Sequence, residues 1–176
     1  MIFVSVGTHE QGFDRLVMKM DELVENGVIR EEVYIQAGYT EYKPRFCKYD
    51  ALIDNRLMEE NVKNARIVIT HAGPGSIMIP FTYNKIPIVV PRQYEFGEHV
   101  DDHQVWFTKK LEEQGKILAV YDINDLKNAI QNYDKLSAYM VCNFHSNAEE
   151  FTEKVEKICE SLLTEKRRKK KKRWKK

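Results

Sequence analysis

Residues 66–76 read RIVITHAGPGS, and this stretch decides the fold. RIVIT is an apolar, β-branched run that is typical of a strand buried in a parallel sheet. It ends at a glycine-rich turn, and the apolar residues after the turn predict a helix over about Ser76–Tyr83. A strand, a glycine loop and a helix in this order predict a parallel sheet that is covered by helices.

The same alternation continues on both sides of this segment. Further strands are predicted at 2–6, 33–37, 86–90 and 117–121, with a short strand at 51–53. Helices are predicted at 13–24, 58–64 and 100–114, after a cap at Asp122, and at 148–162, where apolar residues recur on one helical face. We therefore expect an α/β fold with a Rossmann-like, mainly parallel sheet and helices on both of its faces.

The chain has 176 residues, which is enough for one domain with a single core. No apolar run approaches the ~20 residues that span a bilayer, and Met1–Val6 lacks a basic leader, so we expect neither a membrane helix nor a signal peptide. Three scattered cysteines, Cys47, Cys142 and Cys159, form neither a disulfide framework nor a zinc-binding spacing. The sequence therefore predicts a cytoplasmic location.

Positive charge is concentrated at the C-terminus. The segment Lys166–Lys176 reads KRRKKKKRWKK and holds ten basic residues. Without them, 18 basic residues stand against 27 acidic ones, so the rest of the chain carries a net charge of −9. We expect a globular domain over residues 1–165 and a disordered polybasic tail over 166–176 that meets an anionic surface.

Ligands of open α/β sheets bind at the carboxyl ends of the strands, and three predicted loops leave strands at that edge. The first loop, GTHEQG at 7–12, brings Gly7, Thr8 and His9 to the edge. Glycine allows a backbone to approach a ligand closely. An ordinary strand-to-helix turn with Thr8 as a cap is the alternative interpretation.

The second loop, HAGPGS at 71–76, joins the decisive strand to its helix. Free backbone N–H groups and the helix dipole at such a helix start favour an anion such as a diphosphate. Gly73 and Gly75 leave room for it, and Ser76 can cap the helix or bind a phosphate oxygen. The loop is neither the dinucleotide fingerprint nor a P-loop, because it has neither the spacing of the first nor the lysine of the second.

The third loop, EHVDDHQ at 98–104, places carboxylates, imidazoles and an amide near a helix start. His99 and His103 have the i, i+4 spacing of metal ligands on a helix, but the flanking acids complete no recognised ligand set. A solvated helix start, in which Asp101 and Asp102 meet the dipole, is a second interpretation. We favour a third interpretation, a hydrogen-bonding edge for sugar hydroxyls, and we expect no metal there.

Taken together, the three loops resemble glycosyltransferase family 28 and its single-domain relatives, above all the two-subunit glycosyltransferases of bacterial capsule and exopolysaccharide synthesis. The similarity rests on VGTHEQGFDRL at 6–16, THAGPGSIM at 70–78 and KIPIVVPRQYEFGEHVDDHQ at 85–104, and it covers about residues 1–160. It implies a GT-B fold divided between two chains. This chain would be the C-terminal half, which binds a UDP-sugar, and no metal or other cofactor is implied.

The resemblance also implies roles for individual residues. The glycine-rich loop would contact the diphosphate, the first loop would approach the diphosphate or the sugar, and the end of the third loop would contact the sugar. The residues expected to bind substrate are Gly7, Thr8, His9, His71, Gly73, Gly75, Ser76, Glu98, Asp102, His103 and Gln104. Ile79 stands where relatives often carry a ribose-binding acid, so Glu98 is the candidate for the ribose. His9 is the candidate general base on this chain, and a base on a partner is the alternative.

The implied function is that of the catalytic, donor-binding subunit of an inverting hexosyltransferase. Galactose is the first choice of sugar, with N-acetylglucosamine and glucuronic acid left open, and the acceptor would be a lipid-diphosphate-linked saccharide. A membrane-associated partner subunit would bind that acceptor at the inner face of the plasma membrane. There the tail Lys166–Lys176, with Trp174 as an interfacial anchor, would meet anionic lipids.

Two other function classes remain as alternatives. A non-catalytic accessory subunit would stabilise a partner transferase, but it would leave the diphosphate loop without a purpose. A nucleic-acid-binding protein is suggested by the tail, but a body with a net charge of −9 offers no basic groove for a phosphate backbone. For the tail alone, a solubilising terminus or an RNA-binding arm is the alternative.

Overall fold

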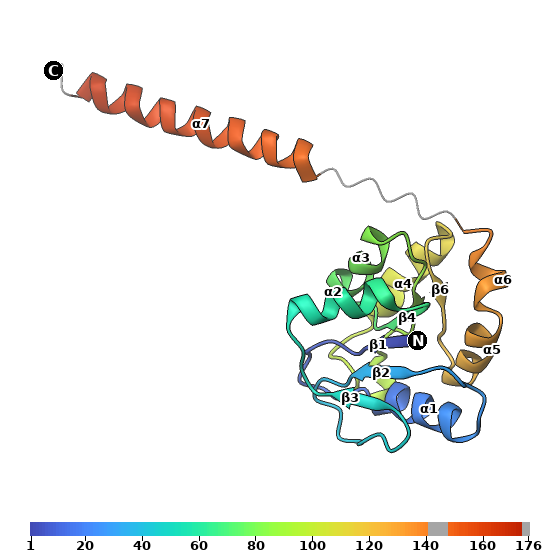
Figure 1. The fold of residues 1–176 in the computed structure, drawn as a ribbon. Coiled ribbons are helices and arrows are strands. Elements are labelled where there is room, and N and C mark those ends of the chain that lie inside the picture. The colour runs from blue at the N-terminus through green and yellow to red at the C-terminus, as the bar shows by residue number, and fades with distance from the viewer. Residues whose placement is uncertain (141–147, 174–176) are drawn as a thin grey trace. The chain divides into compact units, whose positions relative to one another are not determined.

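The computed structural model describes residues 1–140 and 148–173 (Figure 1). The chain divides into two compact units, Met1–Asn143 and Phe144–Lys176. All three loops that the sequence analysis singled out belong to the first unit. Each unit is described by itself below.

The first unit is built on a six-stranded sheet in which every pair of neighbours is parallel. Its strands are β1 (Ile2–Ser5), β2 (Val33–Gln36), β3 (Lys48–Asp50), β4 (Ile67–Thr70), β5 (Ile88–Val89) and β6 (Leu118–Ala119). Their order across the sheet is β3-β2-β1-β4-β5-β6. The predicted Rossmann-like α/β fold is therefore confirmed, and the sheet is parallel throughout.

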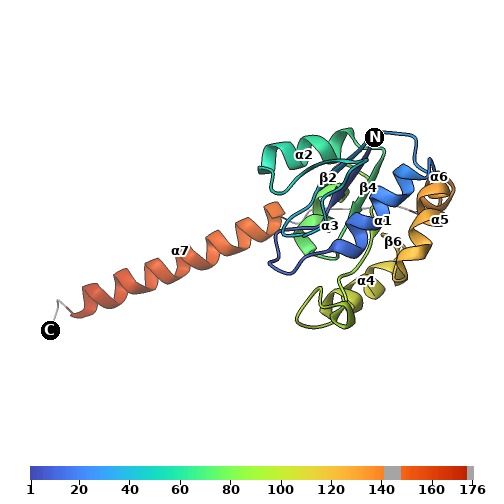
Figure 2. The same ribbon diagram turned by 90° about the horizontal axis from the view of Figure 1, so that it is seen from below.

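Helices cover both faces of this sheet (Figures 1 and 2). On one face, α1 (Asp14–Glu25), α5 (Leu126–Gln131) and α6 (Tyr133–Ser137) pack on Ile2 and Val4. On the other face lie α2 (Asn55–Asn64), α3 (Pro74–Thr82) and α4 (His103–Glu113). Phe3 points to that second face because successive strand residues alternate between faces. Two 3₁₀ helices, η1 (Tyr94–Phe96) and η2 (Ile123–Asp125), lie in the connections.

The order of the strands places a topological switch point between β1 and β4. From β1 the chain runs outward through β2 to β3, and it then returns to β4 on the other side of β1. After β1 the chain leads to α1 on one face of the sheet, and after β4 it leads to α3 on the other face. Doubly wound sheets bind ligands at the carboxyl edge beside such a point. The loops that leave β1 and β4 are those that carry Gly7 and His71–Ser76.

Some predicted boundaries were wrong. The short strand expected at 51–53 is β3 at Lys48–Asp50, an edge strand whose side chains are all exposed, so no apolar run marks it. The helix expected from Val100 begins at His103, because the Asp101 carboxylate accepts the His103 backbone N–H and holds a turn before the helix. α3 begins at Pro74 rather than Ser76, since proline suits the first helical position.

The second unit contains α7 (Ala148–Arg173). This confirms the helix predicted at 148–162, and Phe151, Val155, Ile158 and Leu162 are exposed on it. The backbone of 166–173 continues the helix, although we expected disorder in solution from Lys166, and residues 174–176 lie outside the described part. Disorder in solution and a boundary at 165 stay predictions. Within the described residues, no helix combines the length and the apolar character needed to cross a bilayer.

Candidate functional site

At the switch point, the imidazole of His71 lies between Gly7 and Gly73. A Cβ at Gly7 or at Gly73 would lie well inside van der Waals contact of the His71 ring. Gly7 also has a φ of +79°, a conformation that other residues rarely adopt. The backbones of Gly7 and Gly73 can therefore pack directly against the His71 ring only because neither residue has a side chain.

The His71 ring is held in one orientation and one tautomer. Its Nδ1 accepts the Gly73 backbone N–H at 3.1 Å, so the proton of the neutral ring is assigned to Nε2. Nε2 lies 3.0 Å from Ser76 Oγ and donates to it. Burial, followed by the positive charge of Arg92, lowers the pKa of His71 to about 4. At neutral pH the ring is thus an uncharged donor, and the Ser76 hydroxyl proton remains available to a ligand.

The start of α3 offers backbone donors to solvent. Pro74 occupies the first helical position, and within residues 1–140 no described group accepts the backbone N–H of Gly75 or Ser76. Gly75 is exposed, and a Cβ added there would meet nothing within 4 Å. Two unpaired amides, a helix dipole and open space are the features that favour an anion at a helix start.

Gln36 supports the first loop from the end of β2, and the sequence analysis did not single it out. Its Oε1 accepts the Gly7 N–H at 3.1 Å, and its Nε2 donates to the Gly7 carbonyl at 3.0 Å. The same Nε2 donates to the Ala51 carbonyl at 3.0 Å, beyond β3. Gln36 is almost fully buried, so these bonds fix the backbone of Gly7 on both sides.

Arg92 is the second supporting residue that sequence reasoning missed. Its side chain is fully buried, and its guanidinium lies over the Phe13 ring at 4.9 Å. Nη1 donates to the carbonyls of Gln11, Gly12 and Glu98 at 2.6, 3.1 and 3.0 Å, and Nη2 donates to the Val6 carbonyl at 2.8 Å. Burial lowers the pKa of Arg92 to about 10, which leaves it charged at neutral pH. Its position directly after an apolar strand was the one available signal.

Glu98 is occupied by a second arginine. Its Oε1 and Oε2 accept from Nε and Nη2 of Arg15 at 2.8 and 2.9 Å, and Oε2 also accepts the Gln93 N–H at 3.0 Å. Glu98 is buried by these contacts. The ribose contact expected of Glu98 stays a prediction, and it would require Arg15 to release a carboxylate oxygen.

The end of the third loop is tied to the second loop by Gln104. The side-chain Oε1 of the buried Gln104 accepts the Ala72 backbone N–H at 3.2 Å and the Arg92 backbone N–H at 3.3 Å. Asp102, which is exposed, accepts the Tyr94 N–H at 2.9 Å. The predicted residues of the second and third loops are therefore joined, and Gln104 holds the loops together from the inside.

Three imidazoles form a row along the same edge. The rings of His9 and His99 have centroids 4.5 Å apart, and those of His99 and His103 are also 4.5 Å apart. His9 Nδ1 accepts the Gln11 N–H at 3.2 Å. Burial, followed by the neighbouring His103 and His9, lowers the pKa of His99. The exposed Thr8 precedes this row. The first loop is thus brought to the third, as well as to the second.

One comparison with known proteins shows the family, and a second shows similar folds. The family model described as the glycosyltransferase family 28 C-terminal domain matches residues 1–162. Among solved structures, the glycotransferase of kitacinnamycin is similar with a TM-score of 0.55 and 14% identity, covering 78% of this chain and 37% of that one. The glycosyltransferase SnogD from Streptomyces nogalater gives 0.45 and 14%, covering 80% and 39%. A search of the curated proteins found no match. The chain thus spans well under half the length of the glycosyltransferases it resembles.

Proposed function

Because the chain belongs to glycosyltransferase family 28 and matches the C-terminal domain of that family, we propose that it is the donor-binding, catalytic subunit of a two-component inverting glycosyltransferase. It moves a hexose, with galactose as the first choice, from a UDP-sugar to a lipid-linked saccharide in capsule or exopolysaccharide synthesis. A membrane-associated partner subunit binds the acceptor.

The observation that carries this proposal is the helix start after β4. The unpaired amides of Gly75 and Ser76 point where the dipole of α3 is positive, and the space above Gly75 is open. A diphosphate fits this arrangement because its oxygens accept several hydrogen bonds and its charge is stabilised by the dipole. The Ser76 hydroxyl, which accepts from His71, donates its own proton to a phosphate oxygen.

The reaction requires stabilisation of the negative charge that develops on the leaving diphosphate. The acceptor hydroxyl attacks the anomeric carbon while the bond from that carbon to the diphosphate oxygen breaks, and negative charge develops on UDP. Amides that are already oriented, in a site held by buried hydrogen bonds, stabilise that charge without reorganisation. Arg15 and Arg92 do not approach it, because both are engaged inside the domain.

The two candidates for the general base are His9 and a residue of the partner. Because His9 Nδ1 accepts from Gln11, the neutral ring carries its proton on Nε2 and has no free lone pair to take a second one. We therefore place the base on the partner subunit. His103 and Asp102, both exposed at the edge, contact the donor sugar, while Gln104 positions the loops.

Calorimetric titration of UDP into the purified chain tests the donor site. Gly75→Val fills the open space, and UDP affinity falls more than tenfold while the far-ultraviolet circular dichroism is unchanged. Gly27→Ala, in the turn after α1 and far from this edge, serves as the control and keeps the wild-type affinity. Equal affinity in Gly75→Val and wild type would remove this loop from the site, and no UDP binding by wild type would favour the accessory-subunit alternative.

A transferase assay with a panel of UDP-sugars tests the rest of the proposal. Turnover is expected only when the membrane-associated partner and a lipid-linked acceptor are both present, because one Rossmann-like unit supplies one wall of a GT-B cleft. Robust transfer by the purified chain alone would contradict the two-component arrangement. The sugar that is transferred fastest names the donor.

Liposome co-sedimentation tests the proposed role of the polybasic segment. Full-length protein is expected to bind anionic vesicles in a salt-sensitive manner, because each Lys or Arg near such a surface contributes about 1 kcal/mol. A chain ending at Glu165 is expected to remain in the supernatant. Equal behaviour of both proteins would assign membrane recruitment to the partner subunit.

A further inference from the structure

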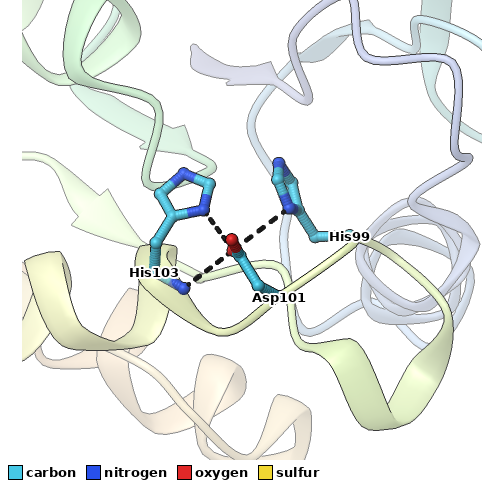
Figure 3. Close-up of side chains that lie close together, drawn as sticks. All are labelled: His99, Asp101 and His103. Atoms are coloured by element: carbon cyan, nitrogen blue, oxygen red, sulfur yellow. Dashed lines mark hydrogen bonds and ion pairs between the residues drawn. The ribbon is translucent and has the colours of Figure 1, made fainter.

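Beside the helix start, a turn brings together three side chains of the kind that bind metal ions. His99, Asp101 and His103 each offer one ligand atom, and these atoms all lie within 4.8 Å of one another (Figure 3). His99 and His103 do not share a helix, because α4 begins at His103, so the turn of residues 99–102 creates the cluster. Asp101 supplies the third group that the i, i+4 spacing of the histidines lacks.

The separation of His99 and Asp101 suits a small coordination sphere. Zinc binds imidazole nitrogen and carboxylate oxygen at about 2.1 Å, so two ligand atoms in a tetrahedral site lie about 3.4 Å apart. His99 Nδ1 and Asp101 Oδ1 are 3.5 Å apart, which matches that edge. His103 Nδ1 is in closer contact with the same oxygen, so binding an ion between them requires this imidazole to move away from that oxygen.

The ligand atoms of His99 and Asp101 are both acceptors. His99 Nδ1 accepts the Val100 N–H at 2.9 Å, so its one lone pair faces that amide, and the proton of the neutral ring is assigned to Nε2. The carboxylate oxygen that lies 3.5 Å from this nitrogen also carries lone pairs, so the two atoms repel. A cation that takes the Nδ1 lone pair in place of the Val100 N–H removes this repulsion. The same cation would replace the proton that His103 shares with Asp101.

The three side chains differ in their exposure to solvent, and the difference suits a metal-binding site. The side chain of His99 is 10% exposed and stacks near His9, whereas those of Asp101 and His103 are 59% and 52% exposed. One ligand is thus held by packing, and the other two open to solvent and admit an ion. Two imidazoles and one carboxylate favour Zn²⁺ and its neighbours over Mg²⁺ or Ca²⁺, which prefer all-oxygen sites.

We propose that His99, Asp101 and His103 bind one divalent transition-metal ion of the zinc class, with at least one coordination position left open to solvent. Because Gln104 follows His103 and bonds to Ala72, the ion lies at the same edge as the helix start of α3. The open position accepts water or an oxygen of a ligand bound there. The proposal concerns the ion alone and does not depend on the donor assignment.

Calorimetry with ZnCl₂ on the metal-stripped full-length chain, purified without a histidine tag, tests the site. Wild type is expected to bind Zn²⁺, and Asp101→Asn and His103→Ala each weaken this binding at least tenfold. Asp101→Asn is informative because its amide oxygen can still accept the His103 backbone N–H and keep the helix start. Asp122→Asn is the matched control, since Asp122 caps η2 in a similar turn and contacts no histidine within residues 1–140.

Cobalt substitution identifies the ligands, because thiolate coordination to Co²⁺ gives a strong near-ultraviolet charge-transfer band that imidazole and carboxylate lack. The expected spectrum has visible d–d bands without that band, and the d–d bands are lost in His103→Ala. Three outcomes overturn the proposal: no Zn²⁺ binding by wild type, equal binding by wild type and both cluster variants, or a thiolate band. The first two would leave Asp101 as a helix-capping residue that also orients His103.

Discussion

Two loops at one edge of the sheet are built in opposite ways. The β4–α3 loop, residues 71–73, contains no charged group at neutral pH, since its histidine is held neutral, and it leads to free backbone amides. The β5–α4 loop, residues 90–102, contains the buried Arg92 and the buried Glu98, and both form hydrogen bonds inside the domain. The comparison teaches that buried charge holds the scaffold here, while backbone dipoles face the proposed diphosphate. The four predictions below test that division.

The largest effect is expected from Arg92→Met. Four backbone carbonyls, those of Val6, Gln11, Gly12 and Glu98, lose their buried donor. The free energy of unfolding is expected to fall by about 3 kcal/mol or more, because each unpaired buried group costs about 1–3 kcal/mol and the loss of a buried charge offsets only part. Urea denaturation measures this, with the exposed Arg56→Met as a control within about 0.5 kcal/mol of wild type.

A stability loss below about 1 kcal/mol in Arg92→Met would contradict the scaffold role of charge. If that variant does not fold, Arg92→Lys provides the measurement. A lysine keeps the charge but reaches fewer carbonyls, so an intermediate loss is expected.

The second prediction concerns pH and the neutral histidine. The folded-state pKa of His71 is about 4, below the ordinary value of 6.5, so the unfolded chain takes up a proton that the folded chain refuses. The stability that this histidine contributes is complete above pH 6.5 and is lost as pH falls toward 4, by at most about 3 kcal/mol. Unfolding curves between pH 7 and 4.5 should show a shallower decline for His71→Gln than for wild type. Parallel declines would mean that His71 is protonated in the folded protein.

The third prediction tests the tie between the two loops. Gln104→Ala removes the acceptor of two backbone N–H groups, those of Ala72 and Arg92, so unfolding becomes about 2 kcal/mol easier. Gln104→Glu keeps an acceptor and is expected to lose less. In the assay with partner, we expect turnover to fall more than UDP affinity does. If UDP affinity falls as far as turnover, Gln104 serves the diphosphate loop alone.

The last prediction distinguishes Gly73, the N-cap of α3, from Gly75 in the first turn of that helix, where the smallest effect is expected. Gly73→Ala places a methyl group against the His71 ring and is expected to cost about 1–3 kcal/mol, whereas Gly75→Ala enters open space and costs less than about 0.5 kcal/mol. Thermal unfolding of both variants measures the difference. Similar losses in the two would show that the ring of His71 can move aside.

Most of the fold could be predicted because its central strands are buried on both faces. Ile2–Ser5, Val33–Gln36 and Ile67–Thr70 have no exposed residue, so each is an apolar run that the sequence displays directly. β3 could not be placed correctly, since Lys48–Asp50 is an exposed edge strand that is defined by its pairing with β2. The hydrophobic periodicity of a sequence indicates which residues are buried, so it gives no signal for an element whose side chains are all exposed.

Of the candidate site, the sequence indicated the loops but not what holds them. Glycine, serine and histidine after a strand are visible as a motif. Arg92 and Gln36 are not, because a polar residue is expected at the surface unless its partners are known, and their partners are backbone atoms of distant segments. The role of Glu98 was likewise hidden, since Arg15 lies 83 positions away in the chain.

The bonds of Arg92 also set an order of events during synthesis. The carbonyls that it holds at Val6 and Gly12 lie 86 and 80 residues earlier in the chain. When the chain is made from its N-terminus, the first loop therefore leaves the ribosome long before the residue that fixes it exists. Until β5 has emerged and joined the sheet, Gly7 has Gln36 as its only support among these ties. When the chain folds as it is made, the edge at the switch point is thus completed only after Arg92 has emerged, and a nascent chain that stops before Arg92 contains both glycine loops without the arginine that fixes the first.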